Sequence, residues 1–230
     1  MANAVVLEEE VVIPLNLHSL ADFRRWARSD EFPERGRIDY IAGRIEVDMS
    51  PESFFSPGGL KSEIHGALQQ LVKRLALGYL RTDRTRVSSV EGDLSAEPDV
   101  VFVSHESLTT GRVRLIPKGG TEGEEYVEVE GGPDLVVEVV GDASVAKDTK
   151  RLPAAYFRAG VREYWLADGR REPFLFCIHR RAEAGFEPVE ADADGFQPSD
   201  VLGCRFRLEG RRDRLGHWAF DLRQKERQGA

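Results

Sequence analysis

The sequence predicts an α/β fold whose strands include at least one parallel pair. The segment 134–168 has the order strand–helix–strand, and such a crossover joins two parallel strands. Two alternating runs at 37–49 predict a β-hairpin, and amphipathic patterns at 19–29 and 60–77 predict helices. An N-terminal helix and hairpin therefore precede a region in which strands and helices alternate.

The composition is that of a globular chain with one domain. Its 230 residues are 41% hydrophobic, enough to bury a core, and 31% charged. No apolar run approaches the roughly 20 residues of a membrane helix, and the N-terminus lacks the pattern of a secretory signal. Two cysteines are too few for a disulfide scaffold. We expect a soluble cytoplasmic protein, and the net charge of −8 argues against binding nucleic acid through overall basicity.

Each element is predicted by its own pattern. Ser19 is placed to cap the first helix, and Gly78 to end the helix 60–77. Strands are expected at 37–41, 44–49, 79–82, 86–90, 99–103, 126–130, 135–140, 161–168 and 174–179, and a further helix at 144–159. Glu128 and Glu130 alternate with valines, so we expect both to face water. The chain would comprise a flexible arm at 1–18, one domain at 19–180, and a C-terminal extension at 181–230 packed on that domain.

Two carboxylates occupy positions where a strand should be buried. Asp99 follows Pro98 at the start of an apolar strand, and Glu138 lies within Leu-Val-Val-Glu-Val-Val at 135–140. A buried carboxylate must be paired with a cation, protonated, or bound to a metal. A turn cap at Asp99 and an ion pair at Glu138 are the structural alternatives. Asp134, also after a proline, is better explained as a turn residue at the start of its strand.

Further charged residues lie near this pair in the predicted elements. Glu63 is on the helix 60–77, and Lys147 and Lys150 open the helix after the Glu138 strand. Two strand acids and a lysine suit phosphodiester hydrolysis, because Mg²⁺ needs only one or two carboxylates and activates a water, while a lysine stabilises negative charge. Asp148, the residue after Lys147, is explained by the attraction of its negative charge to the helix N-terminus.

Three segments and their spacing resemble the Uma family of endonucleases, part of the restriction-endonuclease-like PD-(D/E)XK superfamily. They are EPDVVFV at 97–103, PDLVVEVV at 133–140 and YFRAGVREYWLAD at 156–168. The hairpin and the helix carrying Glu63 are also similar to the family, so the resemblance spans about 20–180. It implies a central mixed β-sheet flanked by helices, a site for Mg²⁺ with Mn²⁺ as an alternative, DNA as the substrate, and a homodimer.

The resemblance also implies roles for individual residues. Asp99 matches the first aspartate of the motif, Glu138 its second acid, and Glu63 an additional carboxylate of the first core helix. The lysine of the simplest motif would stand at Val140, so the resemblance places this role on the next helix, at Lys147 or Lys150, with Lys147 nearer the strand. Asp99, Glu138 and Glu63 would hold the metal.

Two other functions compatible with the same residues stay open. The chain could be a catalytically inactive nuclease fold that acts as a nucleic-acid-binding or assembly module. It could also hydrolyse a small phosphorylated molecule, which the acidic net charge favours. A basic segment that would contact a nucleic-acid backbone comprises Lys73, Arg74, Arg81, Arg84 and Arg86.

Overall fold

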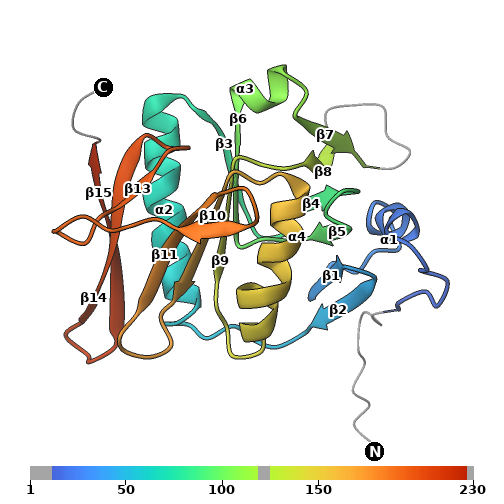
Figure 1. The fold of residues 1–230 in the computed structure, drawn as a ribbon. Helices are drawn as coiled ribbons and strands as arrows, with labels where there is room; N and C mark the ends of the chain where they lie inside the picture. The colour runs from blue at the N-terminus through green and yellow to red at the C-terminus, as the bar shows by residue number, and fades with distance from the viewer. Residues whose placement is uncertain (1–11, 119–124, 227–230) are drawn as a thin grey trace, which may run out of the picture.

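The computed structural model describes residues 12–118 and 125–226, and in these ranges the chain forms three β-sheets with intervening helices (Figure 1). The helices are α1 (Leu20–Ala27), α2 (Gly58–Leu75), α3 (His105–Thr109) and α4 (Leu152–Ala159), with a π-helical turn η1 (Lys147–Arg151) directly before α4. The predicted N-terminal helix, the long second helix and the helix before Gly160 are therefore present.

The central sheet has the strand order β12–β11–β10–β9–β6–β3. Its strands are β3 (Gly78–Thr82), β6 (Val100–Ser104), β9 (Leu135–Val139), β10 (Glu163–Asp168), β11 (Leu175–Arg181) and β12 (Phe186–Pro188). β9 and β10 are parallel, and the other neighbours are antiparallel. The predicted crossover and the mixed sheet are confirmed.

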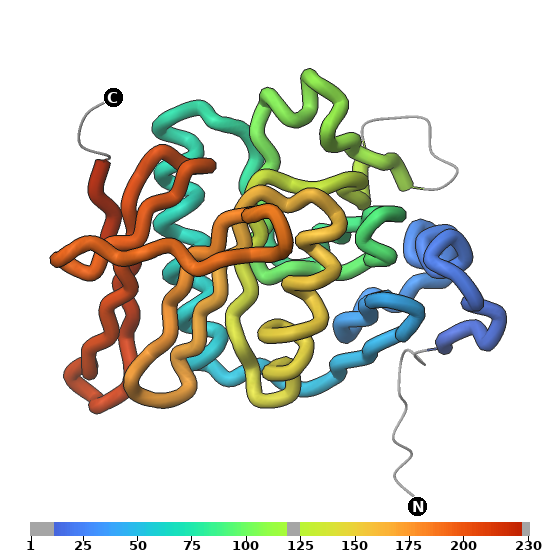
Figure 2. The backbone as a smooth tube through the Cα atoms, in the orientation of Figure 1, coloured from blue at the N-terminus to red at the C-terminus, as the bar shows by residue number. Residues whose placement is uncertain are grey.

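A second sheet, which we call the N-terminal sheet, has the order β2–β1–β5–β4–β8–β7. Its strands are β1 (Arg37–Ile41), β2 (Arg44–Asp48), β4 (Arg86–Ser89), β5 (Leu94–Ala96), β7 (Val113–Pro117) and β8 (Tyr126–Gly131). The third, C-terminal sheet consists of β13 (Gln197–Ser199), β14 (Cys204–Arg212) and β15 (Trp218–Glu226). It lies at the opposite end of the molecule from α1 (Figure 2).

Apolar residues cover both faces of the central sheet. On one face Val100, Phe102 and Val137 pack with α2 and with Phe206 and Leu222 of the C-terminal sheet. The other face packs against α4 and the N-terminal sheet, using Val101, Val103, Val136, Val140, Tyr164, Leu166, Val87 and Val129. The segment 181–226 thus shares the core of the preceding residues, while residues 1–11 of the predicted arm lie outside the described ranges.

One expectation about the N-terminal sheet is wrong. Glu128, expected to face water, is 2% exposed because α1 covers this part of β8. Arg24 of α1 donates to Glu128 Oε1 at 2.7 Å and also binds Glu130. Alternation within β8 distinguishes its two faces but does not reveal that a helix from elsewhere in the chain covers the polar one. No helix among the described residues is long and apolar enough to span a membrane.

Candidate active site

Two neighbouring strands of the central sheet bring the predicted strand acids together. β6 and β9 are antiparallel with Val100 opposite Val137, and continuing this register by one residue places Asp99 opposite Glu138. Opposite residues of an antiparallel pair project from the same face with Cβ atoms about 5 Å apart. Asp99 is 2% exposed and Glu138 is 0% exposed. The two carboxyl groups are therefore buried neighbours.

Asp99 is surrounded by positive charge. Its Oδ1 lies 2.7 Å from Arg37 Nη2 and 2.9 Å from Lys61 Nζ, and its Oδ2 accepts a hydrogen bond from the Val139 amide at 2.7 Å. Burial acts to raise the pKa of Asp99, but the two cations and the amide outweigh it and hold this pKa below its usual value. Asp99 is therefore ionised at neutral pH.

Glu138 has fewer partners than Asp99. The Tyr156 hydroxyl of α4 donates to Glu138 Oε1 at 3.0 Å, and no described residue hydrogen-bonds Oε2. Burial raises the pKa of Glu138 well above its usual value, and the charges of Asp99 and Asp148 raise it further. Burial therefore favours the neutral form of Glu138 in this arrangement. A buried carboxyl oxygen without a partner is rare and is typical of functional sites.

Lys147, one of the two candidate lysines, reaches this cluster. It is buried at the start of η1, and its Nζ lies 3.0 Å from Asp39 Oδ2 on β1. Burial acts to lower the pKa of Lys147, but the neighbouring acids, Asp39 first among them, outweigh it and raise the pKa above its usual value. Lys150, three residues later, is exposed at the surface. The structure thus brings a charged Lys147 to the strand acids and leaves Lys150 outside.

A third acid, Asp148, is buried beside the cluster. It is 1% exposed, Ser144 donates its hydroxyl to Oδ2, and no described residue hydrogen-bonds Oδ1. Burial raises the pKa of Asp148 to about 6, against the lowering effects of Ser144 and Lys147. The sequence interpretation as a helix N-terminal charge does not account for this burial, which follows from the packing of η1 against the sheet.

Glu63, expected as an auxiliary carboxylate, lies elsewhere. Its Oε1 accepts a hydrogen bond from the Leu222 amide of β15 at 2.9 Å. Residues two apart on a helix point about 200° apart, so Lys61 faces Asp99 while Glu63 faces the C-terminal sheet. The structure does not bring Glu63 to the strand acids.

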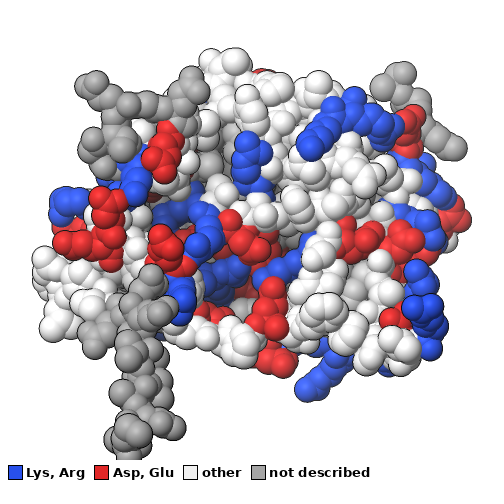
Figure 3. Space-filling model, turned by 180° about the vertical axis from the view of Figure 1, so that it is seen from behind, with Lys and Arg blue, Asp and Glu red and all other residues white. Residues whose placement is uncertain are grey.

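An open cleft lies over the buried cluster. It consists of two adjoining hollows. The first, of about 390 Å³, is lined by Arg37, Lys61, Asp83 and the loop 141–144 that precedes η1. The second, of about 270 Å³, is lined by Asp39 and Lys147 among others. Arg37 and Ser144 line both hollows. Basic and acidic side chains gather together around a hollow in the middle of the rear face (Figure 3). Arg37, Lys61 and Lys147 line this cleft, whereas Asp99 and Glu138 do not.

Sequence reasoning missed four members of the cluster: Arg37, Asp39, Lys61 and Asp148. Only Asp39 carried a signal comparable to that of Glu138, because it stands between Ile38 and Tyr40 in a predicted strand. Arg37 and Lys61 approach Asp99 from a hairpin and a helix that are distant in sequence. The predicted basic segment is also divided, since Arg86 is buried against Glu97 and Arg74 pairs with Glu226.

The sequence matches the Uma2 family, described as "Putative restriction endonuclease", over residues 20–209. This chain belongs to the Uma2 family. The Uma2 match covers the central sheet and continues into β14, which confirms the predicted resemblance and extends it beyond residue 180. Family membership supports a nuclease.

A solved structure shares the fold of this Uma2 protein. It is titled "Crystal structure of a putative nuclease belonging to DUF820 from Anabaena variabilis ATCC 29413", with a TM-score of 0.54 and 19% sequence identity. The match covers 72% of this chain and 82% of that chain. At this identity the likeness shows the fold alone, and it confirms the predicted restriction-endonuclease-like α/β class. The comparison with curated proteins found no match.

Proposed function

We propose that this Uma2 protein is a metal-dependent endonuclease that hydrolyses phosphodiester bonds in DNA. One observation carries the proposal: Glu138 Oε2 is buried without a hydrogen-bond partner among the described residues, next to the ionised Asp99. A divalent cation would bind that oxygen and compensate both carboxylates. The description of the family supports the reaction class, and its word "restriction" supports DNA as the substrate.

The donor set fits Mg²⁺, and Mn²⁺ as an alternative. Mg²⁺ prefers oxygen ligands and uses one or two carboxylates while keeping several waters. Among the described residues, no group of three or more His, Cys, Asp or Glu side chains is arranged to hold a metal, so Asp99 and Glu138 would share the ion with water. Binding requires Glu138 to release its proton and Asp99 to give up a contact with Arg37 or Lys61.

Each side chain of the cluster then has a distinct task. A bound Mg²⁺ would supply charge neutralisation at the scissile phosphate and a lowered pKa for the attacking water. Lys147 is held charged by Asp39 at the edge of the cleft, where it stabilises the negative charge of the transition state. Arg37 and Lys61 line the cleft and bind phosphate oxygens when they leave Asp99. Tyr156 orients Glu138 through its hydroxyl.

Plasmid cleavage in Mg²⁺, Mn²⁺ and EDTA tests the proposal. We expect the wild-type protein to nick or linearise supercoiled DNA with either metal but not in EDTA. We expect Asp99→Asn to be inactive under all three conditions, while Asp194→Asn, whose side chain is 67% exposed and lies outside the cleft, retains wild-type activity. Cleavage by Asp99→Asn at the wild-type rate would exclude this site.

A catalytically inactive nucleic-acid-binding module is the second candidate function. The observation in its favour is that Arg37 and Lys61 together occupy Asp99 Oδ1, where a metal would bind. Thermal unfolding separates the two functions, because a ligand that binds only the folded state raises the melting temperature. We expect Mn²⁺ to raise the melting temperature of the wild type but not of Glu138→Ala. Equal responses of the two proteins would favour the inactive module.

A further inference from the structure

A second cavity, of about 690 Å³, lies between the central sheet and the N-terminal sheet. Its apolar wall is made by Val101 and Val103 of β6 with Leu115 and Val129 from the hairpin β7–β8. Its rim carries Tyr79, Arg81 and Tyr126. We call this cavity the tyrosine pocket. Its volume is within the usual range of ligand sites, about 300–1,000 Å³.

The tyrosine pocket and the buried acids lie along the same strand, β6. Side chains alternate between the two faces of a strand. Asp99, directly before β6, and Val101 and Val103 within it therefore project from the same face. Val101 therefore lies about 7 Å beyond Asp99 along the strand. This face of β6 is itself buried, with Asp99, Val101 and Val103 at most 4% exposed, so a ligand strand bound in the cleft would reach the pocket across the adjoining surface.

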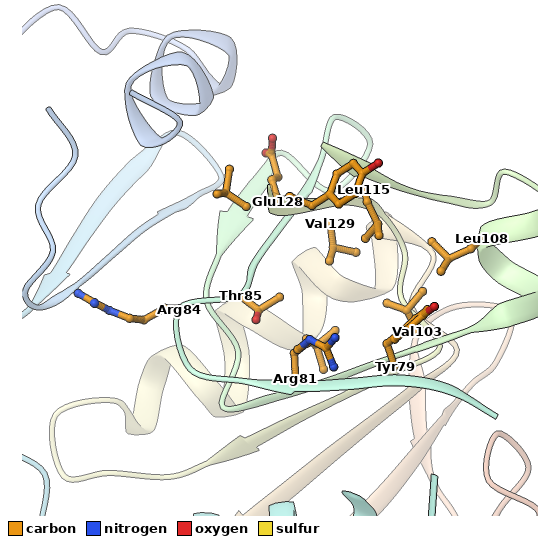
Figure 4. Close-up of a pocket in the computed structure, with 12 residues that line it drawn as sticks. Tyr79, Arg81, Arg84, Thr85, Val103, Leu108, Leu115, Glu128 and Val129 are labelled. Atoms are coloured by element: carbon orange, nitrogen blue, oxygen red, sulfur yellow. The ribbon is translucent and has the colours of Figure 1, made fainter. Parts of the chain in front are cut away.

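A single turn separates the pocket from the cleft. Asp83 lines the cleft and pairs with Arg37, which also binds Asp99. The next two residues, Arg84 and Thr85, line the pocket. Arg84 has a φ of +65°, a left-handed conformation that is costly for a residue with a side chain. Figure 4 shows that its side chain points away from the pocket, whereas that of Arg81 points into it.

The rim offers aromatic surface and an uncompensated positive charge. Tyr79 is 47% exposed and Tyr126 51% exposed. The Tyr79 ring is held in place by the edge of His105, with centroids 5.3 Å apart, and by Arg81 at 5.5 Å. Among the described residues no carboxylate lies within ion-pair distance of Arg81, which donates to the Leu80 carbonyl. The acid on this wall, Glu128, is neutralised by Arg24.

We propose that the tyrosine pocket receives an unpaired base of the nucleic-acid strand bound at the candidate active site. The base would stack on Tyr79, with Tyr126 opposite the apolar wall, while Arg81 binds an adjacent phosphate. Stacking on aromatic rings beside a cation is how proteins bind bases without reading their sequence. A base inside a duplex cannot enter such a pocket. The preferred substrate is therefore a strand with an unpaired nucleotide near the cleavage position. This inference rests on nucleic acid being the substrate of the proposed nuclease.

Binding in EDTA tests the pocket without cleavage. The probes are a fluorescein-labelled 20-nucleotide single strand, versions of it with one abasic residue at successive positions, and the corresponding duplex, each made as DNA and as RNA. We expect the single strand to bind more tightly than the duplex. One or two abasic positions should weaken binding by about 5- to 100-fold, the loss expected for one stacked base.

Variants assign that loss to the pocket. Tyr79→Ala should remove the difference between the intact and abasic strands, and Tyr79→Phe should keep it because the ring remains. Leu115→Trp, at a side chain that is 36% exposed, should fill the cavity and so remove the difference between intact and abasic strands, as Tyr79→Ala does. Leu215→Ala, at an exposed apolar side chain outside the pocket, is the matched control and should behave as the wild type.

Three outcomes would overturn the inference. They are an abasic profile that is flat in the wild type, a profile that neither Tyr79→Ala nor Leu115→Trp changes, and a wild-type dimer in sedimentation that Tyr79→Ala dissociates. The last would make the pocket a contact between copies of this chain. Plasmid cleavage is scored separately. Base-dependent binding without cleavage would reject the nuclease and keep the pocket, whereas cleavage with a flat profile would reject only the pocket.

Discussion

The strand pair β6–β9 carries a buried acid group at each end, and the two ends are built differently. At the start of β9, Asp134 accepts hydrogen bonds from the Ser104 amide at 2.7 Å and from Ser107, and it pairs with Arg112. At the other end, the part of the chain that the structure describes gives Glu138 one donor, Tyr156, and leaves its second oxygen without a partner. Both side chains are no more than 1% exposed.

The contrast separates an acid that holds the fold from one that the fold leaves available. Every acceptor of Asp134 is occupied by a nearby donor, so its burial is compensated within the protein. Glu138 lacks this compensation, and burial favours its neutral form by raising its pKa. Burial alone therefore does not distinguish the two acids, whereas their hydrogen-bond partners do. Variants of the two ends and of the residues around them test this difference.

Exchanging the two acids for their amides should produce opposite phenotypes. Glu138→Gln should lower kcat/KM for DNA cleavage by about 10³-fold or more, because a metal ligand worth several kcal/mol is lost, with little change in the free energy of unfolding. Asp134→Asn should lower that free energy by about 3 kcal/mol, since it leaves Arg112 without its buried partner, and leave the activity of the folded protein near wild type. Cleavage kinetics and urea unfolding of both variants check this. Equal loss of activity in the two variants would contradict it.

The two lysines after β9 provide a second matched pair. Lys147→Met should lower the single-turnover cleavage rate by about 10²-fold, because a buried cation beside the reacting phosphate is lost. Lys150→Met, at the exposed position, should stay within about twofold of wild type. Unfolding curves control for the loss of the Asp39 partner. A larger loss of rate in Lys150→Met than in Lys147→Met would reassign the role.

The pH dependence of stability should reveal the burial of Asp148. Its pKa in the folded protein is about 6, against an ordinary value of 3.8. The folded state therefore keeps a proton at Asp148 that the unfolded chain releases, so the contribution of Asp148 to the free energy of unfolding falls as pH rises from about 4 to about 6. Asp148→Asn should remove this fall, at about 1.4 kcal/mol per unit of pKa.

Urea unfolding in EDTA across that pH range measures the effect of Asp148. Asp142→Asn, on the same loop with a 95% exposed side chain, is the control and should keep the wild-type slope. An unchanged slope in Asp148→Asn would show that Asp148 is ionised in the folded protein.

The smallest effect should come from Glu63. Glu63→Ala should leave cleavage unchanged and lower the free energy of unfolding by about 1 kcal/mol, the loss of its hydrogen bond to the Leu222 amide. Lys61→Ala, two residues earlier on the same helix, should instead weaken DNA binding. Measured affinities and unfolding curves compare the two faces of α2. A cleavage defect in Glu63→Ala would restore the role that the family resemblance implied.

Elements with strong local patterns were predictable, and short or partner-dependent ones were not. The hairpin, α2, β9 and the crossover to β10 follow from apolar spacing, turn residues and chain order. β5 escaped because it is only three residues long, and α3 and β7 because glycines and charged residues interrupt any apolar periodicity at 104–131. The C-terminal sheet could not be predicted because its charged alternating strands become a layer only by packing on α2.

The residues of the candidate site likewise fall into those that a local pattern predicted and those that depend on distant partners. Asp99 and Glu138 were identifiable because an acid in an apolar strand is costly wherever the strand is buried, and Lys147 because of its place after β9. Whether Glu63 or Lys61 faces the acids depends on the rotation of α2, which a periodic pattern fixes only to within a face. The approach of Arg37 depends on how a separate sheet docks.

Residues adjacent in the chain specify the family, the order of the main strands and helices, and the presence of two buried acids. The packing of distant segments sets which charges surround those acids, leaves Glu138 Oε2 without a partner among the described residues, and forms the tyrosine-rimmed pocket nearby. Such features arise between elements separated by many residues, and the electrostatics of a buried group depends on everything within a few ångströms of it, whatever its place in the sequence.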